Sequence, residues 1–324
     1  MADRADSISA EQKRTYAQII DTLTSIFGSH PGYRPAHAKG VVCEGTFTPD
    51  PAAASISHAS HLQLDPVPIT VRFSNFAGIP TVSDGDANAS PRGLGIRFHL
   101  PNGADTDIVA HSYNGFPVAT AEEFLTFLKA LASSGPDAPK PTPLDTFLAG
   151  HPRAKLFIAA KPVPASFAAE SYYGVDAFRF INRDGAMRLG RYRIHPVDGE
   201  HYLDTAAVAA SPANFLFDEL AERLERSPAR FHLFVQLAER SDQTNDASIS
   251  WPDDRPRIEL GTLAVMRNAV DSDAAQRRLL FDPMRLVDGI ELSDDPLVMA
   301  RSAVYAISYE RRQKNAWSGA LSAR

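Results

Sequence analysis

The chain has a single cysteine, Cys43, among its 324 residues. A disulfide within the chain is therefore excluded, and so is a metal site built from several cysteine ligands. We interpret Cys43 as a small buried apolar residue. No apolar run approaches the roughly 20 residues that a membrane-spanning helix requires, so we expect no membrane span.

The sequence also has no cluster of lysine and arginine, and its formal net charge is −6. An acidic chain without a basic patch argues against nucleic acid as the main partner. Residues 1–13 mix charges of both signs and contain no apolar core of the kind found in secretory signals. We therefore expect a cytoplasmic protein, with a periplasmic location as the alternative if a signal has been removed.

Internal repeats and low-complexity linkers are absent as well, which favours one domain over residues 1–324. Eight segments have the composition of β-strands and fall into two blocks of four. They are residues 37–49, 67–75, 94–100, 106–112, 175–182, 187–196, 231–239 and 259–266. Eight antiparallel strands can close into a barrel. The predicted fold is thus α+β, an eight-stranded antiparallel barrel with surrounding helices.

Helices are predicted before, between and after these strands. Apolar residues recur at helical spacing within residues 1–30, where Ser9 can cap a helix that Gly28 stops. Further helices are expected at about 120–133, 211–226 and 294–313. In residues 67–75, Val67, Ile69, Val71 and Phe73 share one parity, and Arg72 and Ser74 share the other.

The last helix holds the first chemical signal. Arg301, Tyr305 and Arg312 are spaced to lie on one helical face. Neighbouring cations favour the phenolate of a tyrosine, and a phenolate is a ligand for ferric iron. Taken alone, the spacing is far more typical of a solvated basic stripe with a half-buried tyrosine than of an iron ligand. His37, taken by itself, is more typical of a structural histidine than of a catalyst.

Four ordered motifs together resemble the haem catalases. HAKGVVCEGTFT (37–48) resembles their distal-histidine strand, and RFSNFAG (72–78) with PRGLGIRFHL (91–100) resembles the next two strands. FDPMRLVDGIELSDDPLVMARSAVYAISYERR (281–312) resembles their proximal segment, and Trp251-Pro252 matches a Trp-Pro motif. Because the chain is short, it is most similar to the small catalase-related peroxidases, which retain the barrel and its haem pocket.

The resemblance implies a role for each matching residue. His37 matches the catalytic distal histidine, Ser74 its hydrogen-bonding partner, and Tyr305 the axial ligand of haem b. Arg301 matches the arginine that donates to the phenolate, and Asp295 an acidic residue of the proximal network. Four further residues match positions around the haem: Arg34, Arg72 and Arg312 at the propionates, and Phe124 near the distal face.

Two positions depart from the family pattern. Where catalases carry an asparagine that helps to hold peroxide, ungapped alignment places His111, and Asn114 follows three residues later. Where catalases carry a histidine near the proximal arginine, this chain has Asp176, which we expect to pair with Arg301 unless it is a strand-edge acid.

The resemblance implies a haem peroxidase that uses hydrogen peroxide or small organic hydroperoxides with a small organic reductant, and has weak catalase activity. Loss of the interlocking arm of long catalases implies a homodimer. Three alternatives stay open. One is a hydroperoxide-rearranging enzyme of the allene-oxide-synthase type, another is a non-catalytic haem-binding barrel, and the third is a ligand-binding barrel without haem.

Overall fold

Eight antiparallel strands form a closed ring in the computed structural model, which describes residues 8–63 and 65–322. The first half of the ring holds β1 (Gly40–Pro49), β2 (Val67–Ser74), β3 (Gly93–His99) and β4 (Asp105–His111). The second half holds β6 (Tyr172–Tyr173), β8 (Met187–Pro196), β10 (Ala229–Leu237) and β11 (Arg257–Asn268). Pairing of β10 with β8 closes the ring, as the sequence predicts.

One predicted barrel strand lies outside the ring. Within residues 175–182 the strand is β7 (Phe178–Ile181), which pairs with β8 and with the short β12 (Ile290–Leu292) at the side of the barrel. The ring position is taken by β6, whose Tyr172 and Tyr173 pair with the far half of β8. Because β8 is ten residues long, its two halves hold different neighbours. A small second sheet pairs β5 (Val163–Pro164) with β9 (Tyr202–Leu203).

The interior of the barrel is filled with apolar side chains. Val71 and Phe73 of β2 and Ile96 of β3 belong to its core and are at most 1% exposed. Cys43 of β1 is fully buried among them, as expected, and its thiol donates to Asn268 Oδ1 at 3.3 Å. Side chains alternate across a strand, so Arg72 and Ser74 stand on the outer surface of the same wall.

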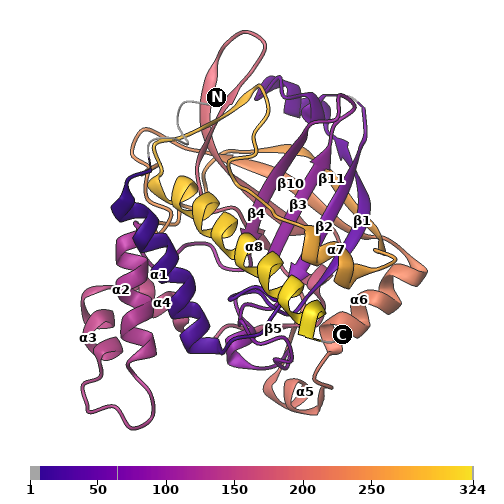
Figure 1. Cartoon of the computed structure of the whole chain (residues 1–324). Coiled ribbons are helices and arrows are strands. Elements are labelled where there is room, and N and C mark those ends of the chain that lie inside the picture. Colours follow the sequence, from indigo (N-terminus) through magenta and orange to yellow (C-terminus); the bar gives the residue numbers. More distant parts are fainter. Residues whose placement is uncertain (1–7, 64, 323–324) are drawn as a thin grey trace.

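Helices cover this outer surface. The helices are α1 (Ala10–Phe27), α2 (Ala121–Ala132), α3 (Pro143–Gly150), α4 (Pro152–Ile158), α5 (Thr205–Ala210), α6 (Phe215–Arg226), α7 (Ser272–Arg278) and α8 (Pro296–Ser322). Figure 1 shows α8, in yellow, crossing the barrel strands, with α1 and α2 beside it. Short 3-10 turns, such as Pro51–Ser55, join the strands. In the described part of the chain, none of the helices combines the length and apolar character needed to span a bilayer.

The ends of α1 follow the predicted signals. Ser9 Oγ accepts from the backbone N–H of Gln12, and Gln12 Oε1 accepts from the backbone N–H of Ser9, which forms a capping box. Gly28 adopts φ +87° at the other end. Residues 1–7 of the segment predicted as an N-terminal helix lie outside the described residues. The predicted helix at 294–313 is observed as α8, and the helix at 211–226 is observed as α6 preceded by α5.

Candidate active site

A row of residues at matching positions on four strands runs beside a large cavity, and Ser74, Gly93 and His111 of this row form one wall of it. Gly40 of β1 pairs with Ser74 of β2, Ser74 with Gly93 of β3, and Gly93 with His111 of β4. The empty volume beside this wall is about 1020 Å³, and α1, α8 and residues 279–281 line its other sides. The cavity therefore lies outside the barrel, between the strand wall and the helices.

His37 lies just before this row, in an unusual backbone conformation. Its φ is +57°, rare for a residue with a side chain, and its N–H donates to Phe76 O at 2.6 Å. Its Nδ1 lies 3.1 Å from Ser74 Oγ, which leaves Nε2 as the free ring nitrogen. Desolvation, with the positive charge of Arg72, lowers the pKa of His37 to about 3. The predicted pair is thus formed, with a neutral imidazole in the cavity wall.

Gly93 makes room for this pair. A β-carbon at position 93 would lie 2.7 Å from both His37 Nδ1 and Ser74 Oγ. Real β-carbons do not approach other atoms so closely, so only glycine fits without displacing the histidine. Strand pairing and the absence of one side chain together fix the position of the imidazole.

His111 also faces the cavity, whereas Asn114 does not. The Nδ1 atom of His111 accepts the N–H of Tyr113 at 3.3 Å, and its buried Nε2 has no partner among the described residues. Burial lowers the pKa of His111 to about 3, so the neutral ring presents Nε2–H to the cavity. Asn114 is not among the cavity-lining residues, and its carbonyl accepts from Ser250 Oγ. Of the two candidates for the missing asparagine, the structure places only His111 at the cavity.

Tyr305 of α8 lines the same cavity and is held by a chain of buried charges. Arg301 Nε donates to Tyr305 Oη at 3.0 Å, and Arg301 Nη1 donates to the buried Asp176, as the sequence predicts. Desolvation lowers the pKa of Arg301, but Asp176 and Tyr305 outweigh it and raise the pKa above its usual value. Asp295 lies outside the cavity lining at the start of α8, where its Oδ1 accepts from Leu297 N at 3.0 Å.

Three arginines meet at the other end of the cavity without a carboxylate partner among the described residues. Arg34 and Arg312 both donate to Leu279 O, at 2.8 and 3.1 Å, and Arg72 donates to His37 O at 2.8 Å. The Nε atoms of Arg72 and Arg312 are buried and unpartnered in this part of the chain. Burial and mutual repulsion lower the pKa of Arg34 and bring that of Arg72 to about 9. Three converging guanidinium groups are suited to binding carboxylates.

Aromatic side chains complete the cavity, and the sequence did not identify most of them. Phe116 and Phe157 line it, whereas the predicted Phe124 packs against Phe116 in a tilted arrangement with the ring centroids 5.2 Å apart. Phe157 of α4 also packs edge-on against His111 at 6.2 Å. On the strand wall, the space left by Gly95 is filled by the ring of Phe281. The sequence could have indicated this contact only if the proximity of Gly95 and Phe281, which are far apart in the chain, had been known.

Comparison with known proteins gives a consistent result. The family model described as "Catalase" matches residues 17–317. The chain is 38% identical over 299 residues to the "Catalase-related peroxidase" of Mycolicibacterium paratuberculosis, covering 91% of this chain and 94% of that protein. It is 34% identical over 302 residues to the "Catalase-related peroxidase" of Synechococcus elongatus, covering 92% and 88%.

The match to long catalases is weaker and covers less of them. Identity to "Catalase isozyme 2" of Cucurbita pepo is 27% over 328 residues, covering 91% of this chain but 63% of that protein. The barrel, the cavity outside its wall, and both His37 and Tyr305 lie within the matched range. The chain is an oxidoreductase of the catalase family, acting on peroxide.

Proposed function

We propose that the chain is a haem b peroxidase that reduces hydrogen peroxide or small organic hydroperoxides with an organic electron donor, and that its catalase activity is weak. The observation that carries this proposal is the placement of three chemical groups around one cavity. A neutral histidine faces it, a tyrosine oxygen held by an arginine faces it, and three arginines that have no carboxylate partner in the described part of the chain line it.

The residues present fit a haem. Both propionates of the porphyrin can pair with the guanidinium groups of Arg34, Arg72 and Arg312, and the buried Nε atoms of Arg72 and Arg312 have no acceptor among the residues that the structure describes. The oxygen of Tyr305 would hold the haem iron, and the guanidinium of Arg301, whose Nε lies 3.0 Å away, would stabilise negative charge on that oxygen. When bound, the haem supplies an iron that accepts peroxide and takes up its oxidising equivalents.

His37 supplies the proton transfer. The uncharged Nε2 can accept the proton of a hydroperoxide and return it to the oxygen that leaves as water or alcohol. Its pKa of about 3 keeps the ring neutral, and therefore able to accept, throughout the physiological range. Ser74 fixes the ring orientation through Nδ1, and the T-shaped contact with Phe76 at 5.4 Å restrains it from one side.

The reductant distinguishes the two possible cycles. In the peroxidase cycle one hydroperoxide takes up two electrons and two protons from two donor molecules and yields an alcohol or water and one water. In the catalase cycle a second hydrogen peroxide is the two-electron donor and yields oxygen. His111 replaces the asparagine amide by an imidazole with a single donor, Nε2–H. We infer that this change weakens binding of the second peroxide.

The test is purification with haem, followed by absorption spectroscopy and peroxide assays of His37→Ala and Tyr305→Phe. We expect Tyr305→Phe to lose the high-spin ferric spectrum, and His37→Ala to keep the haem but lose peroxide reactivity by at least about 100-fold. An unchanged function in His37→Ala would support a haem-binding barrel instead. Conversion of a fatty-acid hydroperoxide to an epoxide without a reductant would support the rearranging enzyme.

Two further predictions from the resemblance extend the proposal. A homodimer is expected, and light scattering on the purified protein measures it. A cytoplasmic location is expected too, and cell fractionation with an antibody against the chain measures it.

A further inference from the structure

A second pocket adjoins the arginine end of the cavity from the outside. It lies between α1 and α8, has an empty volume of about 710 Å³, and is lined by Asp21, Thr24 and Ser29 on one side and Arg311 on the other. Arg34 and Arg312 line both the pocket and the cavity. Neither His37 nor His111 lines the pocket. A molecule held here would therefore reach the site from the arginine end and leave the two histidines free for peroxide.

The charges around this pocket do not cancel. Arg311 pairs with Asp21 at 2.6 Å, so these two residues contribute no net charge. The three arginines at the end of the cavity have no carboxylate partner among the described residues, and a haem would bring only two propionates. One guanidinium charge would therefore remain at the boundary between cavity and pocket.

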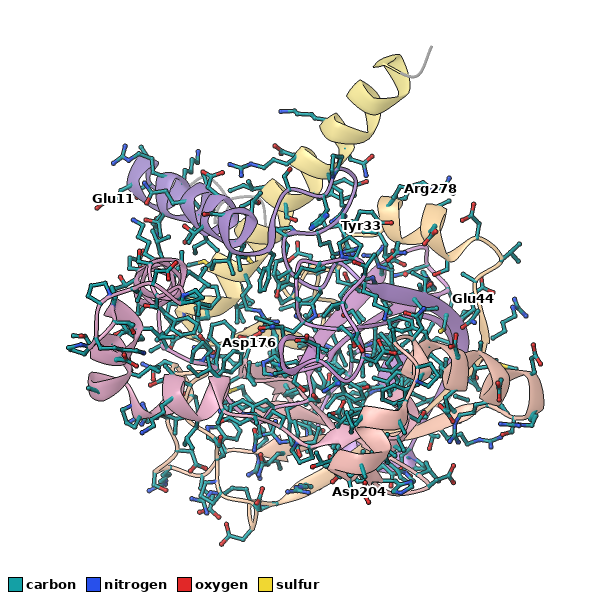
Figure 2. The ribbon with its side chains drawn as sticks, turned by 90° about the horizontal axis from the view of Figure 1, so that it is seen from below. Glu11, Tyr33, Glu44, Asp176, Asp204 and Arg278 are labelled. Atoms are coloured by element: carbon teal, nitrogen blue, oxygen red, sulfur yellow. The ribbon has the colours of Figure 1, made fainter. Side chains whose placement is uncertain are left out.

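An aromatic side chain forms part of the pocket wall. Tyr33 precedes Arg34 and is 46% exposed, which is high for a residue of its size. Figure 2 shows Tyr33 between α8 and α7, and it lines both this pocket and a smaller one beside Gln276. An exposed ring next to a positive charge provides a stacking surface for an aromatic anion.

We infer that this pocket binds the organic reductant, and that the preferred reductant is a small phenol that also carries a carboxylate. The inference rests on the proposed function and specifies its second substrate. The carboxylate would face the surplus guanidinium charge, and the aromatic ring would lie against Tyr33. The phenol O–H bond of each donor molecule breaks as it gives up one electron and one proton and leaves as a phenoxyl radical, so two donor molecules are consumed for each hydroperoxide reduced.

The experiment varies the charge of the pocket and of the donor separately. Ser29→Asp adds one negative charge at an exposed loop position, and Ser29→Asn is the matched control of similar size without charge. Asp21→Asn does the opposite, because it releases Arg311 from its partner. Three phenols that differ in charge serve as donors to the haem-loaded protein: the anion para-hydroxyphenylpropionate, the neutral para-ethylphenol and the cation tyramine.

In Ser29→Asp we expect the Michaelis constant for para-hydroxyphenylpropionate to rise about three- to tenfold. That range corresponds to one unit charge about 7 Å away in a largely hydrated pocket. The constant for para-ethylphenol should not change, and the constant for tyramine should fall. In Asp21→Asn the Michaelis constant for para-hydroxyphenylpropionate should fall and the constant for tyramine should rise. Equal Michaelis constants in Ser29→Asp and Ser29→Asn for all donors would overturn the inference.

Two more measurements separate this inference from the proposed function. The rate of reaction with peroxide before donor is added should be the same in both Ser29 variants, because the pocket does not contain His37. Saturation-transfer NMR with para-hydroxyphenylpropionate should show binding to the haem-loaded wild type that Ser29→Asp weakens. Loss of donor oxidation with retained, charge-sensitive binding would refute the peroxidase but support the site. Binding that ignores the charge at position 29 would refute the site.

Discussion

Gly93→Ala tests whether the strand wall positions the catalytic histidine. The new β-carbon would lie 2.7 Å from His37 Nδ1, and an ordinary contact is at least 3.4 Å, so the ring must move by about 0.7 Å. The backbone of His37 is fixed by its 2.6 Å bond to Phe76 O, so the imidazole rotates instead. The 3.1 Å contact with Ser74 Oγ is then broken.

A displacement of this size has a large kinetic effect. Misplacing a catalytic group by 1 Å can slow a reaction by about 100-fold, so we expect kcat/KM for peroxide to fall by about 10- to 100-fold. Stopped-flow mixing of the haem-loaded variant with peroxide measures the rate. Ser74→Ala removes the hydrogen bond to His37 without introducing the clash, so its kcat/KM for peroxide should fall less than that of Gly93→Ala.

Gly135→Ala is the matched control for the substitution itself. A β-carbon at position 135 would meet nothing within 4 Å, and the backbone there is compatible with alanine. We expect its rate to equal that of the wild type. A rate for Gly93→Ala within twofold of Gly135→Ala would refute the conclusion that the glycine positions the histidine.

Three further predictions concern charge and stability. Asp176→Asn leaves Arg301 without its carboxylate and should lower the free energy of unfolding by about 3 kcal/mol in guanidinium titrations; a loss below about 1 kcal/mol would contradict this. Arg312→Gln should speed haem loss to apomyoglobin about tenfold or more, and an unchanged rate would argue against a propionate contact. Burial lowers the pKa of His61 to about 3, so the stability it contributes is present above pH 6.5 and is lost as the pH falls towards 3. Between pH 7 and pH 5 the free energy of unfolding should fall by about 2 kcal/mol because of His61. In His61→Phe, the difference in the free energy of unfolding between the two pH values should be smaller by that amount.

The local pattern of the sequence predicted the barrel wall well. Alternation in residues 67–75 placed Val71 and Phe73 on one face and Arg72 and Ser74 on the other, and the structure has the first pair in the core and the second at the site. A period of two residues depends only on the strand itself, so it can be read without the partners. The resemblance then identified His37 and Tyr305, which line the same cavity although most of the chain separates them in sequence.

Features that depend on distant contacts were predicted less well. The segment at 175–182 has the composition of a barrel strand, but the two residues of β6 take its position in the ring. Strand β8 is long enough to pair with β7 along its first half and with β6 along its second half. Helix α7 and strand β12 were not predicted, since both are short. Asn114 and Phe124 lie outside the cavity lining, while Phe157 reaches it from a helix whose sequence carries no sign of that role.

The row from Gly40 to His111 also determines which changes in length the chain can tolerate. Its members come from four different strands and coincide only because each strand is in one register with the next. One residue inserted within β2 would turn Phe73 towards the cavity and Ser74 towards the barrel core. An insertion in the loop between Asn75 and Arg92 would leave the register of all four strands unchanged. Natural variants of this protein should therefore differ in loop length, while the lengths of these strands stay fixed.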